Sequence, residues 1–209
     1  RHPFKNSYEV GFNEEGKILA LKIKFVADGG AYTDLTPSIL DRAMFHADGC
    51  YFFENILIEG IAVRTNHQSH TAFRGFGGPQ GNLTTESILE DIAIYLKKDA
   101  YEIRRLNLYE RQLSDLDDQD KHEVKNNKQN RNTTHYGQEI GDNMLAEIFD
   151  TLHQESEYKQ RLQHVVNFNE KKCGKIRGLS LTGCKFGIAF TARFLNQGNA
   201  LVHIHLDGT

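Results

Sequence analysis

The chain has 209 residues, of which 39% are hydrophobic and 25% are charged, a composition typical of a globular protein and not of a disordered one. Its formal net charge of −3 and its pI near 6.4 give no overall electrostatic reason to bind nucleic acid. The three cysteines are odd in number and widely spaced, which argues against a disulfide framework or a CxxC metal site and fits a reducing compartment.

The apolar runs are all short. None approaches the roughly 20 residues needed to span a bilayer, and the first residues lack the apolar core of a signal peptide. We therefore expect a cytoplasmic protein with no membrane segment. The chain also begins without Met and ends on a turn-like sequence at Leu206–Thr209, which suggests a segment excised from a longer protein.

The first half of the chain begins with a strand pattern. Alternating apolar residues predict a β-hairpin over residues 7–27, with Leu19 on the same face as the apolar residues that follow it, and a further strand over 56–65. Between them, a Thr-Pro-Ser sequence predicts the start of a helix whose apolar positions continue to Ala47. Arg42 lies outside that apolar stripe, which is typical of a solvated residue.

A glycine-rich stretch over residues 69–81 follows. Its composition predicts a shaped loop without regular structure. Helical spacing from Ile88 to Leu96 predicts a helix behind the loop, and a second short helix follows at Ile103 and Leu106.

Residues 113–132 contain almost no apolar side chains, which predicts a mobile polar linker between an N-terminal part, 1–112, and a C-terminal part, 133–209. In the C-terminal part, helical periodicity over 143–168 predicts a helical hairpin, and alternation from Ile176 onward predicts strands. Together these elements predict an α+β fold with mixed sheets and packed helices.

The glycine loop is the most informative candidate site. Glycines let backbone N–H groups approach a ligand closely, and a helix start favours anions. The loop matches neither a nucleotide-binding P-loop nor a dinucleotide fingerprint. A plain strand-to-helix connection would explain the glycines, but not Arg74, which can bind an oxyanion, nor the apolar faces of Phe73 and Phe76.

Two weaker patterns lie near the C-terminus. Phe186 and Phe190 would share one face of a strand, as they would in ordinary core packing. His203 and His205 have a spacing that a metal could use, but no cysteine or carboxylate is patterned around them, so we interpret them as surface residues.

Residues 71–81, TAFRGFGGPQG, resemble the AFRGFGGPQ signature of the molybdenum hydroxylases, the family that contains the xanthine dehydrogenases and aldehyde oxidases. The resemblance covers nearly the whole chain apart from the polar linker. Further matching segments lie, in order, at 11–21, 41–48, 134–138, 185–191 and 195–208. It implies that the chain is part of the molybdopterin-binding domain of such an enzyme.

The resemblance also implies which residues contact the cofactor. Phe73, Arg74 and Gly75 would bind the molybdenum–molybdopterin cofactor, with Arg74 on the metal side, where its guanidinium and the backbone hold the metal's ligands.

On the substrate side, the resemblance implies that Phe76 stacks on the substrate ring, that Phe190 meets the ring edge-on and that Thr191 offers it a hydroxyl. Arg42 resembles the arginine that purine-oxidising members place opposite the metal. There it would hold a purine oxygen and the negative charge that spreads over the ring.

The implied activity is hydroxylation of hypoxanthine and xanthine toward urate with oxygen from water. The family's catalytic base would lie beyond Thr209, so we expect no catalytic residue here and an inactive isolated chain. The implied partners are an iron–sulfur and FAD subunit or domain, in a dimer of heterodimers. The alternatives are a hydroxylase of the same fold acting on an aldehyde or another N-heterocycle, and a non-catalytic binding module.

Overall fold

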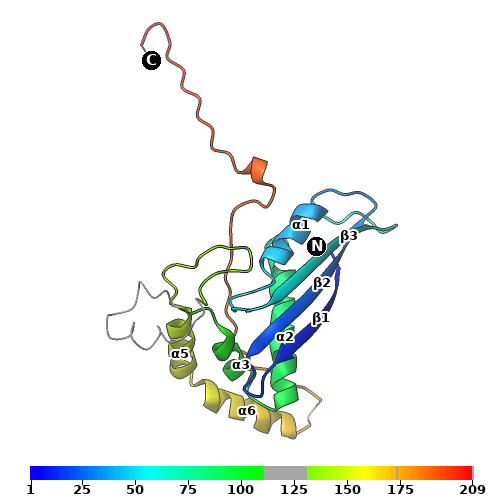
Figure 1. The fold of residues 1–209 in the computed structure, drawn as a ribbon, viewed down its shortest axis with the longest axis vertical. Helices are drawn as coiled ribbons and strands as arrows, with labels where there is room; N and C mark the ends of the chain where they lie inside the picture. The colour runs from blue at the N-terminus through cyan, green and yellow to red at the C-terminus, as the bar shows by residue number, and fades with distance from the viewer. Residues whose placement is uncertain (111–130, 173, 209) are drawn as a thin grey trace.

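The computed structural model describes residues 1–110, 131–172 and 174–208. Their centre is a three-stranded mixed sheet packed on helices (Figure 1), which confirms the expected α+β class. Strands β1 (Phe4–Phe12) and β2 (Ile18–Gly30) are antiparallel and confirm the predicted hairpin. Strand β3 (Ile56–Arg64) lies parallel to β2 on its other side, and helix α1 (Thr36–Phe45) makes the crossover between them.

The sheet buries one face of β2. Ile23, Phe25 and Ala27 are each 0% exposed, as strict alternation predicts. Leu19 was expected on this face, but it is 45% exposed, and Ile18 is buried instead. The register of β1 and β2 shifts at Gly11/Phe12, and such a bulge changes which residues face the core.

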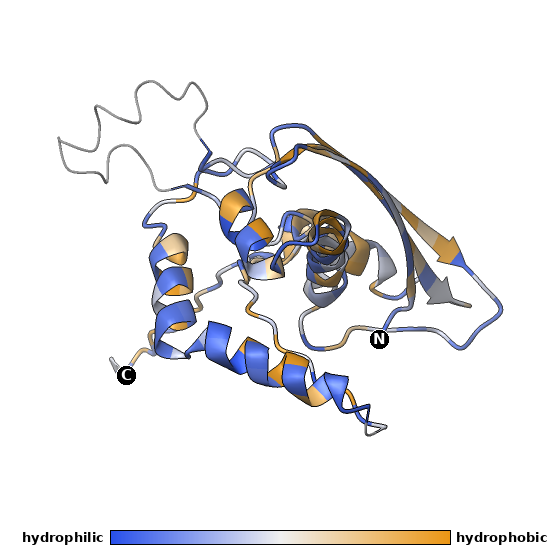
Figure 2. Ribbon diagram, turned by 90° about the horizontal axis from the view of Figure 1, so that it is seen from below, coloured by the Kyte–Doolittle hydropathy of each residue, from blue (hydrophilic) through white to orange (hydrophobic). Residues whose placement is uncertain are grey.

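Helix α2 (Gly78–Leu96) packs on the buried face of the sheet, and α3 (Ala100–Asn107) follows it. Figure 2 shows the sheet curving around one side of α2, with the later helices away from the sheet. The buried Asn107 joins these layers, because its Oδ1 accepts from Ile18 N at 2.9 Å and its Nδ2 donates to Gly16 O at 3.0 Å.

Two later helices, α5 (Leu145–Glu155) and α6 (Tyr158–Glu170), cover the core with Phe149 and Tyr158, which join the same apolar cluster as the residues of α2. The expected helical hairpin is not formed, since α5 and α6 meet at a corner (Figures 1 and 2). Glu157 between them has a φ of +52°, which turns the chain sharply. Among the described helices, none combines the length and apolar content that a membrane span requires.

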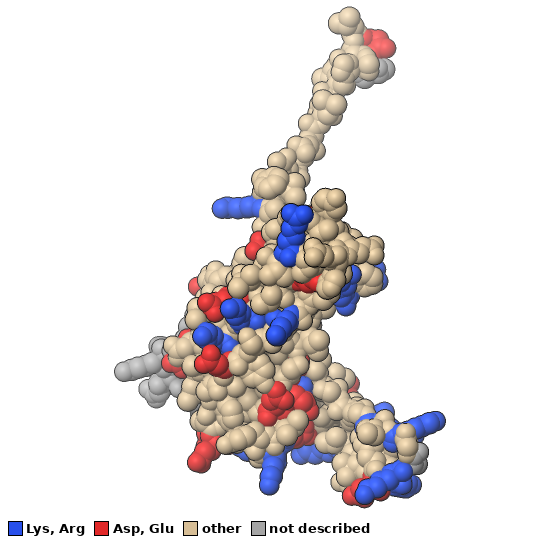
Figure 3. Space-filling model, turned by 90° about the vertical axis from the view of Figure 1, so that its right-hand side faces the viewer, with Lys and Arg blue, Asp and Glu red and all other residues tan. Residues whose placement is uncertain are grey.

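The strands predicted from Ile176 onward are wrong. Residues 174–208 contain one 3₁₀ turn, η2 (Arg193–Leu195), and no strand. Past η2 the chain projects from the body as a nearly uncharged extended segment (Figures 1 and 3), with Leu201 95% exposed. Alternation alone cannot make a strand, because a strand needs a neighbour to receive its hydrogen bonds, and no described segment lies beside this one.

The predicted linker over 113–132 falls mostly outside the described residues. Its last two residues are described: Arg131 pairs with Glu110 at 2.5 Å, and Asn132 is 1% exposed. Both residues therefore pack against described parts of the fold.

Candidate functional site

The glycine loop is held tightly against α1. A Cβ atom on Gly77 would lie 2.0 Å from the carbonyl oxygen of Ile39, and one on Gly81 would lie 2.4 Å from that of Ala43. Only glycine permits this approach of two backbones. Helix α2 begins at Gly78, within the stretch that was expected to be irregular, and Pro79 in its first turn is compatible with a helix start.

The backbone of the loop is contorted at three successive residues. Gly75, Phe76 and Gly77 have φ values of +92°, +51° and +101°. Two successive turns are each closed by a backbone hydrogen bond between residues three apart. Phe76 N donates to Phe73 O and Gly78 N donates to Gly75 O, both at 2.8 Å. A left-handed phenylalanine costs on the order of 1 kcal/mol, and such strain is concentrated at ligand sites.

This conformation leaves several donors of the loop unused. Within the described residues, the backbone N–H groups of Arg74, Gly75 and Gly77 donate to no protein group. The Arg74 side chain is exposed, and in the same part of the structure its guanidinium has no carboxylate or carbonyl partner. Arg1 packs over the Phe73 ring, 4.4 Å from the guanidinium carbon to the ring centroid, and donates to Arg74 O at 3.2 Å.

The segment over residues 185–191 has no regular structure, and it lies along α1. The Arg42 guanidinium donates to the carbonyl oxygens of Gly187 and Ala189, and Thr191 Oγ1 donates to Ser38 O at 2.9 Å. Arg42 is only 5% exposed, so the solvated alternative for this residue is wrong. The Arg42 side chain and the backbone of α1 therefore hold this segment in place.

These contacts bring the predicted substrate residues together. The rings of Phe76 and Phe190 lie 5.2 Å apart between centroids and are tilted by 50°. Phe186 was expected to share a strand face with Phe190, but it packs on the His46 ring at 4.7 Å, because the segment is not a strand.

His46 is a site residue to which the sequence pattern assigned no role. Its Nε2 accepts from Gly187 N at 3.1 Å, so its Nδ1 carries the proton and donates to Arg42 O at 2.9 Å. Burial lowers the pKa of His46, which fits this neutral form. The same segment is thus fastened by Arg42 and by His46, one turn apart.

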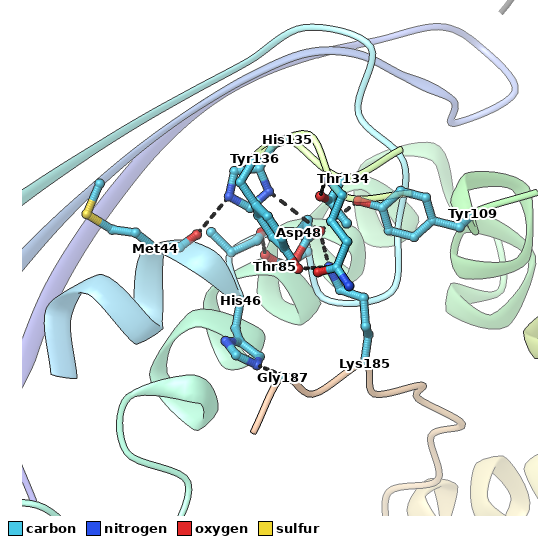
Figure 4. Close-up of polar contacts among 12 residues, drawn as sticks. Met44, His46, Asp48, Thr85, Tyr109, Thr134, His135, Tyr136, Lys185 and Gly187 are labelled. Atoms are coloured by element: carbon cyan, nitrogen blue, oxygen red, sulfur yellow. Dashed lines mark hydrogen bonds and ion pairs between the residues drawn. The ribbon is translucent and has the colours of Figure 1, made fainter. Parts of the chain in front are cut away.

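Asp48 is the centre of a buried polar cluster beside the site (Figure 4) and was also missed. It is 1% exposed, and its Oδ2 accepts from Lys185 Nζ and from Tyr109 OH, the latter at 2.6 Å, while His135 Nδ1 lies 3.5 Å away. Burial alone would raise the pKa of Asp48, but His135, Lys185 and Tyr109 together lower it, so the carboxylate is ionised. The cluster anchors the beginning of the 185–191 segment.

Comparison with known proteins gives a consistent picture. The family model described as molybdopterin cofactor-binding domain matches residues 1–108. Xanthine dehydrogenase/oxidase from Felis catus and xanthine dehydrogenase from Dictyostelium discoideum are each 40% identical over 209 residues, 100% of this chain and 14% of each relative. The chain thus spans a small part of the length of these relatives.

Solved structures agree. Aldehyde oxidoreductase from Desulfovibrio desulfuricans superposes with a TM-score of 0.65 at 27% identity, over 80% of this chain and 16% of that one. Quinoline 2-oxidoreductase from Pseudomonas putida 86, with a TM-score of 0.61 at 22% identity over 80% of this chain and 20% of that one, shares the fold. The matched domain, the whole-chain sequence identity and the shared fold lead to one conclusion: this chain belongs to the molybdopterin cofactor-binding domain family.

Proposed function

We propose that this chain forms part of the cofactor and substrate pocket of a xanthine dehydrogenase, a molybdenum hydroxylase that acts on purines. The observation that carries the proposal is the meeting of Phe76 and Phe190 beside a glycine loop in which the N–H groups of Arg74, Gly75 and Gly77 have no acceptor among the described residues. One side of this arrangement suits a flat ring, and the other suits anionic ligands.

The donor set of the loop fits a molybdenum–molybdopterin cofactor. The N–H groups of Arg74, Gly75 and Gly77, together with the free Arg74 guanidinium, would hold the anionic oxygen ligands around the metal, and Phe73 would flank them. When bound, the cofactor supplies the redox chemistry of hydroxylation. The chain's own part is to position the cofactor and to exclude water through packed aromatic rings.

The substrate side would recognise a planar heterocycle. Phe76 would stack on its face and Phe190 would meet its edge, and the 50° tilt between the two rings lies between the parallel and the perpendicular arrangement. Thr191 would offer its hydroxyl to the substrate as an acceptor, because its proton is already donated to Ser38 O. Arg42 would stabilise negative charge that develops on the far side of the ring, in a buried setting where a guanidinium interacts strongly.

Two bonds of Arg42 are already made to the carbonyl oxygens of Gly187 and Ala189. A guanidinium has five N–H donors, so these bonds leave capacity for a substrate oxygen, and they fix the orientation of the group. Such pre-organisation is what a transition-state contact requires.

A purine substrate is favoured over an aldehyde because the 40% identical relatives over the full chain are xanthine dehydrogenases, whereas the aldehyde oxidoreductase structure is 27% identical over 80% of the chain. The second candidate function, hydroxylation of an aldehyde or another N-heterocycle, rests on the shared fold. A non-catalytic module of this fold is the third, and molybdenum analysis of the complete protein excludes it if the metal is present.

The complete protein would supply what this chain does not. We propose that the catalytic base comes from beyond Thr209 and that iron–sulfur and FAD domains or subunits receive the electrons, in a cytoplasmic dimer of heterodimers. Isolated residues 1–209 would then be inactive on xanthine. Turnover by this chain without any added subunit would contradict the proposal.

The decisive experiment is Arg42→Met in the complete protein, assayed on xanthine and on one small aldehyde. Losing one pre-organised charged donor costs on the order of 3–4 kcal/mol, so kcat on xanthine should fall about a hundredfold or more while aldehyde turnover is retained. Arg105→Met is the matched control, because Arg105 is a partly exposed arginine paired with Asp150 on the protein surface.

Assays on the two substrates distinguish two roles for Arg42: direct recognition of the purine, and positioning of the segment that carries Phe190. Because Arg42 also holds the segment that carries Phe190, a purely structural role would lower both activities equally or reduce the molybdenum content. Equal loss on both substrates, or no loss on xanthine, contradicts the purine role of Arg42.

A further inference from the structure

A second group of metal-ligating side chains lies outside the proposed pocket, where β2 ends. Asp28 belongs to β2, and His67 and His70 lie in the segment between the end of β3 and Phe73. One ligand atom from each of these residues lies within 4.8 Å of the others. The two histidines are separated by two residues, so a single short loop delivers both imidazoles to one carboxylate.

The two oxygens of the Asp28 carboxylate have different surroundings: one accepts hydrogen bonds from neighbouring protein groups, and the other faces the two imidazoles. Asp28 Oδ1 accepts from Thr65 Oγ1 at 2.6 Å and from Gly30 N at 2.9 Å. Its Oδ2 lies 2.7 Å from His67 Nδ1 and 3.9 Å from His70 Nε2. The hydrogen bonds from Thr65, His67 and Gly30 lower the pKa of Asp28, so it is an anionic ligand at neutral pH.

His70 provides an independent indication of a ligand. Its Nε2 is buried and makes no hydrogen bond in the described part of the chain, although it faces Asp28 across 3.9 Å. A buried ring nitrogen in that state usually has a partner. The His67 side chain is 72% exposed, so the cluster opens to solvent on that side and an ion could enter.

We propose that Asp28, His67 and His70 form a binding site for a divalent transition-metal ion of the Zn²⁺ class, with water in the remaining coordination positions. Two imidazoles and one carboxylate favour such an ion over Mg²⁺ or Ca²⁺, which prefer oxygen ligands.

The distances fit this assignment. Two ligand atoms that are each about 2.0–2.1 Å from an ion lie about 2.9–3.4 Å apart at octahedral or tetrahedral angles. The spacings of 2.7 and 3.9 Å from Asp28 Oδ2 are each within about 0.5 Å of that range, and the ligand nitrogens of His67 and His70 lie within 4.8 Å of each other. An ion would replace the hydrogen bond between His67 and Asp28 and would engage His70.

The site would connect the end of β2 to the loop that leads into Phe73 and Arg74. His70 is three residues before Phe73, so a bound ion would fix the entry to the glycine loop. This role is independent of the proposed purine chemistry, because it needs neither substrate nor molybdenum.

The test is equilibrium dialysis of the complete protein against Zn²⁺, with bound zinc counted by elemental analysis, which distinguishes it from molybdenum and iron. His67→Ala is the key variant, because this exposed side chain can be removed without disturbing the core, and Asp28→Asn keeps the Oδ1 acceptor while removing the charge. The matched control is the double variant His203→Ala/His205→Ala, whose exposed rings lie 4.4 Å apart between centroids.

We expect the unaltered protein to bind one more zinc ion per chain than the His67→Ala protein. Zinc binding at this site should be at least tenfold weaker in His67→Ala, in His70→Ala and in Asp28→Asn. Equal zinc binding by the unaltered protein and His67→Ala, or loss of zinc only in the His203/His205 control, would overturn the proposal. The amount of bound zinc is measured without any activity assay, so the outcome for the zinc site is independent of the outcome for the proposed function.

Discussion

Lys185→Met tests whether the Asp48 cluster holds the 185–191 segment in place. The substitution keeps an apolar chain of similar length and removes the ammonium that donates to Asp48 Oδ2. Asp48 is 1% exposed and its Oδ1 has no hydrogen-bond partner among the described residues, so its charge would lose a main source of compensation.

The expected cost follows from the remaining contacts. Removing one partner of a buried ion pair typically lowers the free energy of unfolding by about 3–5 kcal/mol. Tyr109 OH at 2.6 Å and His135 at 3.5 Å still stabilise the carboxylate, and the Lys185 side chain is 22% exposed, which places the effect near the lower limit. We therefore expect a loss of about 3 kcal/mol in the free energy of unfolding.

Urea unfolding of the chain measures this loss. With an m-value of about 2 kcal/mol/M, the midpoint should fall by about 1.5 M. Lys22→Met is the matched control, because Lys22 pairs with Glu9 at 3.4 Å on the surface, and its loss should cost less than about 0.5 kcal/mol. Adding Asp48→Asn to Lys185→Met should recover part of the loss, since it removes the uncompensated charge. The reasoning fails if Lys185→Met and Lys22→Met are equally mild.

Two further predictions concern the loop and its neighbours. Gly77→Ala should destabilise the chain by at least about 2 kcal/mol more than Gly137→Ala in urea unfolding, because both have positive φ but only Gly77 meets an obstacle, Ile39 O at 2.0 Å; equal costs would contradict the close packing of the loop. Burial lowers the pKa of His46 from its ordinary value of 6.5, so the unfolded state binds more protons below that pH and stability should fall as the pH drops from 7 to 5. His46→Gln should make the thermal unfolding midpoint less dependent on pH in this window, with a residual slope from His2, whose pKa is also lowered by burial; an unchanged slope would show that His46 does not titrate as described.

Local patterns predicted the elements whose pairing is local. The β1–β2 hairpin and α1 follow from periodicity and turn residues, and both occur as expected. The exposed Leu19 shows where this reasoning ends, because a single bulge changes which face a residue occupies, and hydrophobic alternation does not reveal bulges. The missing strand at the C-terminus has a related cause, since pairing depends on a neighbour and not on the strand's own sequence.

The site was less accessible to sequence reasoning. The family resemblance singled out Arg42, Phe76 and Phe190 as candidate site residues, whereas the pattern around Arg42 alone predicted a solvated side chain, and Arg42 is in fact 5% exposed. Asp48 and Lys185 are 137 residues apart and their spacing suggests no partnership. Only the fold, which places the turn after α1 against the C-terminal segment, shows that these two charges compensate each other.

Helix α1 lies against both sides of the proposed pocket. Its backbone oxygens limit the approach of the glycine loop at Gly77 and Gly81, and its side chains hold the segment that carries Phe190. Substitutions on this one helix would therefore shift the two aromatic rings relative to each other without replacing either ring. An effort to redirect substrate preference by directed evolution should consequently sample α1 as thoroughly as the residues proposed to touch the substrate.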